Sequence, residues 1–321
     1  SLKMPKLDSN QSRQRTVRST MEAQKIIYGT ALVSGPITFV DAGGTDNQDL
    51  YHAIALAGHE CEDITDIYFD NELILDSAIN GGASSGGNVT TGTFGPINSN
   101  TICKINKHLG SSTQTADSDL VAAFTNYTAN HRGRGIAYIV TKWTLNEDSQ
   151  ETWDKLSPND IRALVKGRKV YDPRDDTSAG ANPTSASYIS FSDNPALCLA
   201  DYLTNDTFGV GIATSKIDWA SVVSAANVCD TTVAIPTSST EKRFTCNGVL
   251  FGGNSHKSNI DKILSSFNGM LTYTGGNYTI RAGAYESPSE SLNEDDLAGP
   301  IEIITSTERS NRFNTIKGLF I

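Results

Sequence analysis

Residues 258–280 read SNIDKILSSFNGMLTYTGGNYTI, and this stretch decides the fold class. Apolar side chains recur there at the i, i+3, i+4, i+7 spacing of one helix face: Ile260, Ile263, Leu264 and Phe267. Gly269 is a natural helix stop. Apolar and aromatic residues then alternate on both sides of Gly275-Gly276-Asn277, which is typical of a β-hairpin. A helix followed by a hairpin in a mostly β chain predicts an α+β protein and not a doubly wound parallel sheet.

Two further helices are expected upstream. Asn194 can cap a helix that has Pro195 in its first turn, and the apolar residues of 196–203 share one face. Asp218 can cap a second helix, whose apolar residues between 219 and 226 repeat the same spacing.

The rest of the chain is dominated by short strand-like runs. Residues 26–28, 37–40 and 136–140 are β-rich, and residues 64–75 predict a hairpin around Asp70-Asn71. Residues 80–100 are rich in Gly, Ser, Thr and Asn and are expected to form a long exposed loop. The predicted fold is therefore β-rich α+β, with a few short helices packed on antiparallel sheets.

We expect the chain to have three regions, distinguished by charge and by the kind of secondary structure. Residues 1–20 form a basic arm that we expect to become ordered only against a partner. Residues 21–160 form a first β-rich region and residues 161–321 a second, α+β region, and an interleaved arrangement of the two remains open. The formal net charge is −10, but six basic side chains lie in residues 1–25, which leaves −14 for residues 26–321. A body this acidic repels phosphate, so tight DNA binding is not expected.

Cysteine usage and hydropathy narrow the class of protein. The five cysteines are scattered without a CxxC pair, which predicts buried, reduced thiols and folding in a cytoplasm. No run approaches the ~20 apolar residues of a membrane span, and the N-terminal residues do not resemble a secretory signal.

The sequence contains few candidates for catalysis or metal binding. Residues 82–86 match G-x-S-x-G, but the flanking glycines cannot supply the strand and helix that a nucleophile Ser84 requires. Residues 59–63 read HECED, and His59 and Cys61 would share a face in a strand, yet His52 lies on the opposite face and a closed zinc site needs about four ligands. A flexible loop and a turn are the better interpretations.

The acidic motifs are equally incomplete. Residues 172–176 (DPRDD) lack the ligand spacing of an EF-hand, and Asp295-Asp296 lies in a generally acidic stretch. A glycosidase needs one acid and one base, and nothing selects them among 36 carboxylates. A phosphate-binding G-x-x-x-x-G-K-[ST] motif is not found. We therefore expect no enzyme activity, no catalytic, cofactor-binding or metal-binding residues, and no cofactor.

Several short segments carry a resemblance to a known family. They are RS at 18–19, IYG at 27–29, DSQETW at 148–153, VKGRKVYDPR at 165–174, SDNPA at 192–196, DYL at 201–203, AANVCD at 225–230, KRFTCNG at 242–248 and RFNTIKG at 312–318. In their order and spacing they resemble the central tail hub family of siphophages, of the tip attachment protein J type.

This resemblance implies a function and a set of partners. Members are structural virion proteins at the tail tip, made in the host bacterial cytoplasm, with tail-tube-like hub domains that form a homotrimeric ring. The implied partners are the distal tail protein, other tail-tip proteins and the C-terminal end of the tape measure protein, with genomic DNA passing without specific binding. Long members continue past the hub into fibronectin-like domains and a fibre that touches the host, and the resembling segments of this sequence are those of the hub.

Two other classes of protein compete with the structural hub. A cell-wall hydrolase carried at the tail tip would degrade peptidoglycan as a purified chain. A receptor-binding module would adsorb to host cells and block infection.

Overall fold

The computed structural model describes residues 22–81, 85–150, 160–178, 181–235 and 239–285, and the single positions 287, 290, 291, 293, 296 and 299. The chain divides into two compact units, residues 1–283 and 284–321. All helices and strands named below belong to the first unit. In the described part of the chain, no helix has the length and apolar character needed to cross a membrane.

Two antiparallel sheets form the first half of this unit. One has four strands in the order β2 (Thr30–Val33), β10 (Ile161–Lys166), β5 (Asp63–Phe69) and β6 (Glu72–Ile74). The other has five strands in the order β3 (Ile37–Gly43), β4 (Asp49–Ala57), β9 (Ala137–Thr144), β8 (Cys103–His108) and β7 (Gly86–Asn88). Short 3-10 turns at Thr45–Asn47 and Asp76–Ala78 connect strands.

The two sheets enclose the first hydrophobic core. Alternate residues of β10 (Ile161, Ala163 and Val165) are fully buried and pack with Ile105 and Ile139 of the five-stranded sheet. Such alternation places every second side chain of a strand on the core side. The opposite face of the five-stranded sheet carries a separate aromatic cluster beneath α1 (Ser118–Ala123), in which Asp117 caps the helix.

The expectation that residues 80–100 form a long exposed loop is wrong for residues 86–94. Residues 86–88 form β7, and Val89 and Phe94 are buried in the first core. The Phe94 ring packs edge-on at 5.3 Å from Phe69 and 5.4 Å from Trp143. A single aromatic ring that reaches the core outweighs a loop-like local composition, because it removes a large apolar area from water.

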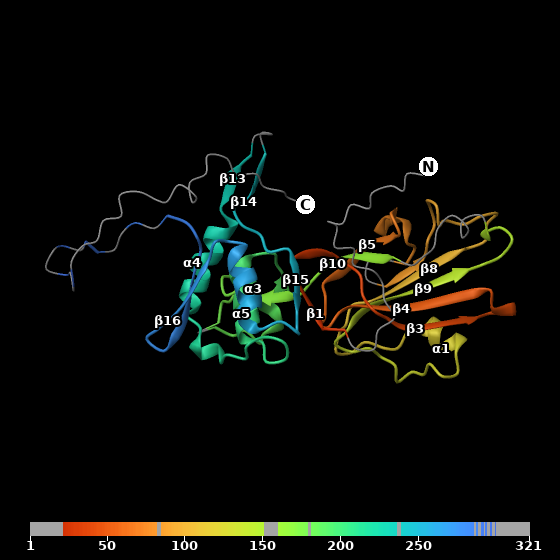
Figure 1. Cartoon of the computed structure of the whole chain (residues 1–321), viewed down its shortest axis with the longest axis horizontal. Coiled ribbons are helices and arrows are strands. Elements are labelled where there is room, and N and C mark those ends of the chain that lie inside the picture. Colours follow the sequence, from red (N-terminus) through yellow and green to blue (C-terminus); the bar gives the residue numbers. More distant parts are fainter. Residues whose placement is uncertain are drawn as a thin grey trace, which may run out of the picture. The chain divides into compact units, whose positions relative to one another are not determined.

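The second core is built around a buried helix (Figure 1). The α3 helix (Pro195–Thr204) buries eight of its ten residues, and α4 (Trp219–Asp230) and α5 (His256–Ser265) pack beside it. The small two-stranded sheets of this region are β11–β12 (Lys169–Tyr171, Ile189–Phe191), β13–β14 (Thr232–Ala234, Thr240–Lys242) and β16–β17 (Met270–Thr274, Asn277–Arg281). The remaining 3-10 turns are Ala186–Tyr188 and Thr214–Lys216.

One strand, β1 (Lys25–Tyr28), serves both cores. It pairs with β15 (Gly248–Phe251), and all four of its residues are buried. Ile27 belongs to the first core, whereas Ile26 and Tyr28 belong to the second. Gly29 then turns the chain into β2 with a φ of 61°, and a Cβ there would lie 2.1 Å from the carbonyl oxygen of Cys246. Only glycine fits this position.

The fold class matches the expectation: the protein is β-rich α+β, with antiparallel sheets and few helices. The hairpins around Asp70-Asn71 and Gly275-Gly276 are confirmed, and Tyr273 pairs with Tyr278 in the second of them. Asn194 and Asp218 cap their helices, and the third helix begins at His256 because Ser255 caps it. All five cysteines are buried.

Sequence position does not separate the two cores. β10 comes after residue 160 yet lies in the four-stranded sheet, and β1 comes before it yet pairs with β15. A boundary at residue 160 therefore divides both a sheet and a core. The basic arm, residues 1–20, lies outside the described residues.

Candidate functional site

The most concentrated polar site lies where β1 contacts both cores. Arg168 Nε donates to Asp201 Oδ2 at 2.7 Å, and Tyr28 Oη donates to the same oxygen at 2.6 Å. The Arg168 guanidinium carbon also lies 5.0 Å from the centre of the Phe208 ring. Burial, followed by the charge of Asp201, raises the pKa of Tyr28 well above its usual range, so this phenol stays a donor. We call Tyr28, Arg168 and Asp201 the junction cluster.

His59 also anchors β1, through a hydrogen bond with the backbone of Ile27. Its Nε2 accepts the Ile27 N–H at 2.8 Å, and its Nδ1 lies 2.8 Å from the Glu60 carbonyl oxygen. Both contacts are satisfied by the neutral imidazole with its proton on Nδ1. Burial lowers the pKa of His59 to about 4. Cys61 Sγ lies 3.8 Å from His59 Nδ1, but burial raises the pKa of this thiol to about 12, so the pair is not an activated nucleophile.

The buried, neutral His59 makes stability depend on pH. Because the pKa is about 4 in the folded state and 6.5 in the unfolded state, the unfolded chain binds more protons between these values. We expect the free energy of unfolding to fall as pH decreases below 6.5, by about 2 kcal/mol at pH 5, and to be flat above 6.5 as far as His59 is concerned.

Urea unfolding at pH 7.5 and pH 5 measures this loss, with His59→Gln as the comparison. The variant should lose less stability than the parent between the two pH values. An equal loss in both proteins would show that His59 is not the titrating group.

The other candidates for metal or acid chemistry do not assemble. Among the described residues, no group of three or more His, Cys, Asp or Glu side chains is placed to hold a metal. His52 lies in β4, opposite Val40 and Thr141 of the neighbouring strands. Ser84 and Asp295 lie outside the described residues, and Asp296 is exposed.

A second polar cluster fastens the helices of the second core. Arg174 forms ion pairs with Asp172 at 2.6 Å and with Asp230 at 2.8 Å, and Lys242 bridges Asp230 at 3.1 Å and Asp193 at 2.8 Å. Asp172 is therefore engaged within the protein. Asp176, in the same motif, accepts from Tyr171 Oη at 2.6 Å, and hydrogen bonds from Ser178 and Tyr171 lower its pKa.

Both clusters bring together the segments that carry the family resemblance. The junction cluster joins residues 27–29, 165–174 and 201–203, and the Arg174 cluster joins 165–174, 192–196, 225–230 and 242–248. The sequence did not reveal these clusters, because their members are up to 173 residues apart. The charged side chains form ion pairs with one another, so these clusters hold elements of the fold together.

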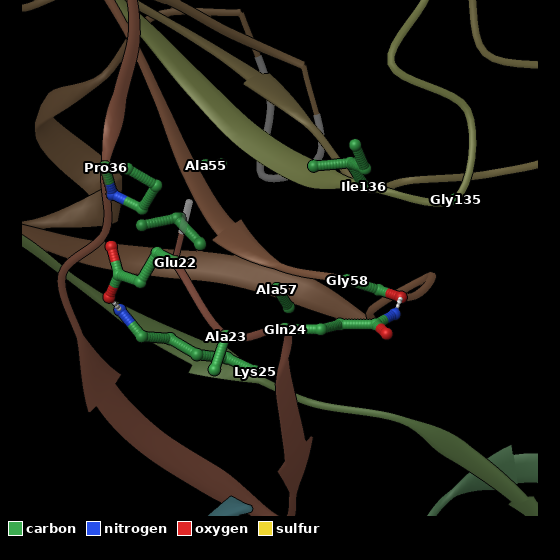
Figure 2. A pocket seen from close by; sticks show the side chains of 11 residues that line it. Glu22, Ala23, Gln24, Lys25, Pro36, Ala55, Ala57, Gly58, Gly135 and Ile136 are labelled. Carbon is green, nitrogen blue, oxygen red and sulfur yellow. Dashed lines mark hydrogen bonds and ion pairs between the residues drawn. The ribbon is translucent and has the colours of Figure 1, made fainter. Parts of the chain in front are cut away.

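A pocket of about 260 Å³ opens beside the start of β1 (Figure 2). Its walls are mainly apolar, and Pro36 and Ile136 line opposite sides of it. The ionisable residues lining it are Glu22 and Lys25, which form an ion pair at 3.0 Å. Gln24 is tied to the Gly58 carbonyl, so little of this lining is free for chemistry.

Comparison with known proteins finds a sequence similarity to a phage hub protein. No family model matches it. Over 201 residues, 58% of the chain, it is 26% identical to baseplate hub protein pb3 of Escherichia phage T5, and the match covers 20% of that protein. Among solved structures it is similar to a chain of the virion of a native gene transfer agent particle, with a TM-score of 0.45, 15% identity, and coverage of 89% of this chain and 58% of that one.

The similarity to pb3 favours a relationship to phage hub proteins in general and does not distinguish the tip attachment protein J type. The chain spans about a fifth of the length of the curated relative that it matches.

Proposed function

We propose that this protein is a structural component of a phage tail hub and not an enzyme. The observation that carries the proposal is the similarity to a baseplate hub protein over 58% of the chain. The polar clusters support it, because their charges are paired within the fold and brace strands and helices against each other. Such bracing suits a protein that transmits load in a particle.

The finer parts of the proposal concern assembly. We infer a homotrimeric ring at the tail tip, built from two interleaved hub regions, that contacts the distal tail protein, other tail-tip proteins and the end of the tape measure protein. The acidic body favours passage of DNA without binding, since it offers phosphates little counterion release. The basic arm, residues 1–20, is proposed to contact a neighbouring tail protein.

A trimer is the expected assembly state in the particle. Each interface between copies should bury more than about 2,000 Å², as is usual for obligate contacts. Threefold-averaged electron microscopy of the intact tail tip measures both the copy number and the interfaces. A ring of six copies, or a single copy per tail, would contradict the proposal.

The competing functions give different results with the purified chain. Release of soluble fragments from peptidoglycan would identify a cell-wall hydrolase. Adsorption to host cells that blocks infection would identify a receptor-binding module. A structural hub is expected to do neither.

A further inference from the structure

An apolar pocket and a basic loop lie next to each other at the start of β9. The pocket of about 260 Å³ is lined by Ile136, which is 42% exposed, and by Pro36 on its opposite side (Figure 2). A cavity of about 150 Å³ holds a benzene ring, so this pocket has room for a leucyl side chain. Residues 125–135 lead directly into Ile136 and carry Arg132 and Arg134 but no acidic residue. We call this pocket and the loop of residues 125–135 the basic pocket.

The loop is fastened by the buried side chain of Gln114. Its Nε2 donates to the carbonyl oxygens of Arg132 and Gly133 at 3.0 and 2.8 Å. Arg132 and Arg134 are exposed, and each donates from Nε to a backbone carbonyl oxygen at 3.2 Å. Among the residues that the structure describes, no carboxylate forms an ion pair with either guanidinium. Both charges can therefore meet carboxylates of a partner, and little backbone entropy is lost because the loop is already hydrogen-bonded.

The other end of β9 carries the opposite combination of an apolar side chain and negative charge. Leu145 follows the strand directly and is 50% exposed, and its N–H donates at 2.8 Å to the Gln48 carbonyl in the loop between β3 and β4. Exposed carboxylates lie on both segments joined by this bond, Glu147 on one and Asp46 on the other. Neither this loop nor residues 145–150 contain a basic residue. We call Leu145, Glu147 and Asp46 the acidic tip.

We propose that the acidic tip of one copy of this protein docks into the basic pocket of a second copy, with Leu145 in the cavity and the carboxylates against the arginines. β9 has eight residues, which at about 3.3 Å each place the two surfaces roughly 25 Å apart. They therefore do not meet within one chain, and the contact joins two copies head to tail. Such contacts close into a ring when the rotation between copies allows it. The ring rests on the proposed function, whereas the contact itself does not.

Charge favours this contact over other contacts between copies. Two bodies that each carry a net charge of −14 over residues 26–321 repel each other in most orientations. The basic pocket is a surface on which an approaching acidic copy meets positive charge instead. Complementary charge sets the orientation and the rate of encounter, and burial of Leu145 against Ile136 removes apolar surface from water.

The test reverses the charges of the two surfaces in the full chain. One variant carries Arg132→Glu with Arg134→Glu, and the other carries Asp46→Lys with Glu147→Lys. Sedimentation velocity over a concentration series should show association of the parent chain, and each variant alone should associate at least about tenfold more weakly, because like charges then face each other. A mixture of the two variants should recover the association, since both the acidic loop with the basic tip and the basic loop with the acidic tip are complementary.

Leu145→Ser tests the apolar part of the contact and should also weaken association about tenfold. Leu73→Ser is the matched control, because Leu73 is 45% exposed on β6, outside both surfaces, and it should leave association unchanged. A parent chain that stays monomeric throughout the series would leave the pocket to a different partner and would overturn the proposal. Association that the mixture of variants does not restore, or that both serine substitutions weaken equally, would also overturn it.

The contact and the proposed function can fail separately. A trimer in the tail tip whose interfaces exclude the acidic tip would contradict the contact and leave the hub function standing. Association through the two surfaces by a protein that is absent from tails would support the contact and refute the hub function. Electron microscopy of the particle and sedimentation of the purified variants together distinguish these results.

Discussion

Replacing Asp76 by Ala is expected to lower the free energy of unfolding by about 3–5 kcal/mol. Asp76 forms an ion pair with Lys107, whose side chain is fully buried on the core side of β8. Without the carboxylate, the buried ammonium group loses its ion pair. Lys107 Nζ also lies 3.4 Å from the Thr65 carbonyl oxygen, a longer and weaker contact than the ion pair.

The same strand supplies a matched control. Lys104, on the opposite face of β8, pairs with Asp119 at 2.6 Å, and both of these side chains are about a third exposed or less. Asp119→Ala should therefore cost about 1 kcal/mol or less, because water can solvate the remaining charge.

A rescue variant separates the buried charge from other effects of the substitution. Lys107→Met keeps a long apolar stem and removes the charge, so Asp76→Ala combined with Lys107→Met should return to within about 1 kcal/mol of the parent. Urea unfolding of Asp76→Ala, Asp119→Ala, Lys107→Met and the double variant, each compared with the parent protein, measures these differences. Equal losses for Asp76→Ala and Asp119→Ala, or the lack of any rescue, would contradict the interpretation.

Replacing Arg168 by Ala is expected to cost about 2–4 kcal/mol and to loosen β1 specifically. The substitution leaves the Asp201 carboxylate, which is 14% exposed, with the Tyr28 hydroxyl as its remaining partner in the junction cluster. An unpaired and mostly buried carboxylate is costly. The loss is placed below that of Asp76→Ala because the Asp201 carboxylate left behind is 14% exposed, whereas the Lys107 side chain is fully buried.

Hydrogen exchange of the β1 and β15 amides gives the local readout. Exchange there should accelerate in Arg168→Ala, and Arg168→Lys should recover part of the protection because it restores a positive charge beside Asp201. Tyr28→Phe, which removes a single hydroxyl, is the milder control. If exchange accelerates uniformly over the unit in Arg168→Ala, the junction cluster does not act on β1 in particular.

The elements that sequence patterns predicted best are those fixed by local rules. The hairpin at Gly275-Gly276 needs a two-residue turn with positive φ, and the α3 helix needs a cap followed by proline; both requirements are visible in a few residues. Residues 86–94 were misjudged because their burial depends on Phe69 and Trp143, which are distant in sequence.

The candidate sites also differ between features visible in a local pattern and contacts that depend on residues far apart in the sequence. The residue pattern favours a turn over a metal site at His59 and Cys61, but it does not reveal that His59 accepts a hydrogen bond from the Ile27 N–H. The junction cluster was equally hidden, since Tyr28, Arg168 and Asp201 are ordinary residues until the fold brings them together. Charge pairing over such separations leaves no periodic signal in a sequence.

The shared strand β1 has a consequence for synthesis on the ribosome. Ile27 packs in the first core with β10, whose residues emerge more than a hundred positions later, and β1 pairs along its edge with β15, which follows by more than two hundred. Neither core can close on the first half of the chain alone. Nascent chains therefore carry exposed apolar strand surface through most of translation, and native contacts of such long range fold slowly. A chaperone that covers these strands until β15 emerges would raise the yield of folded protein.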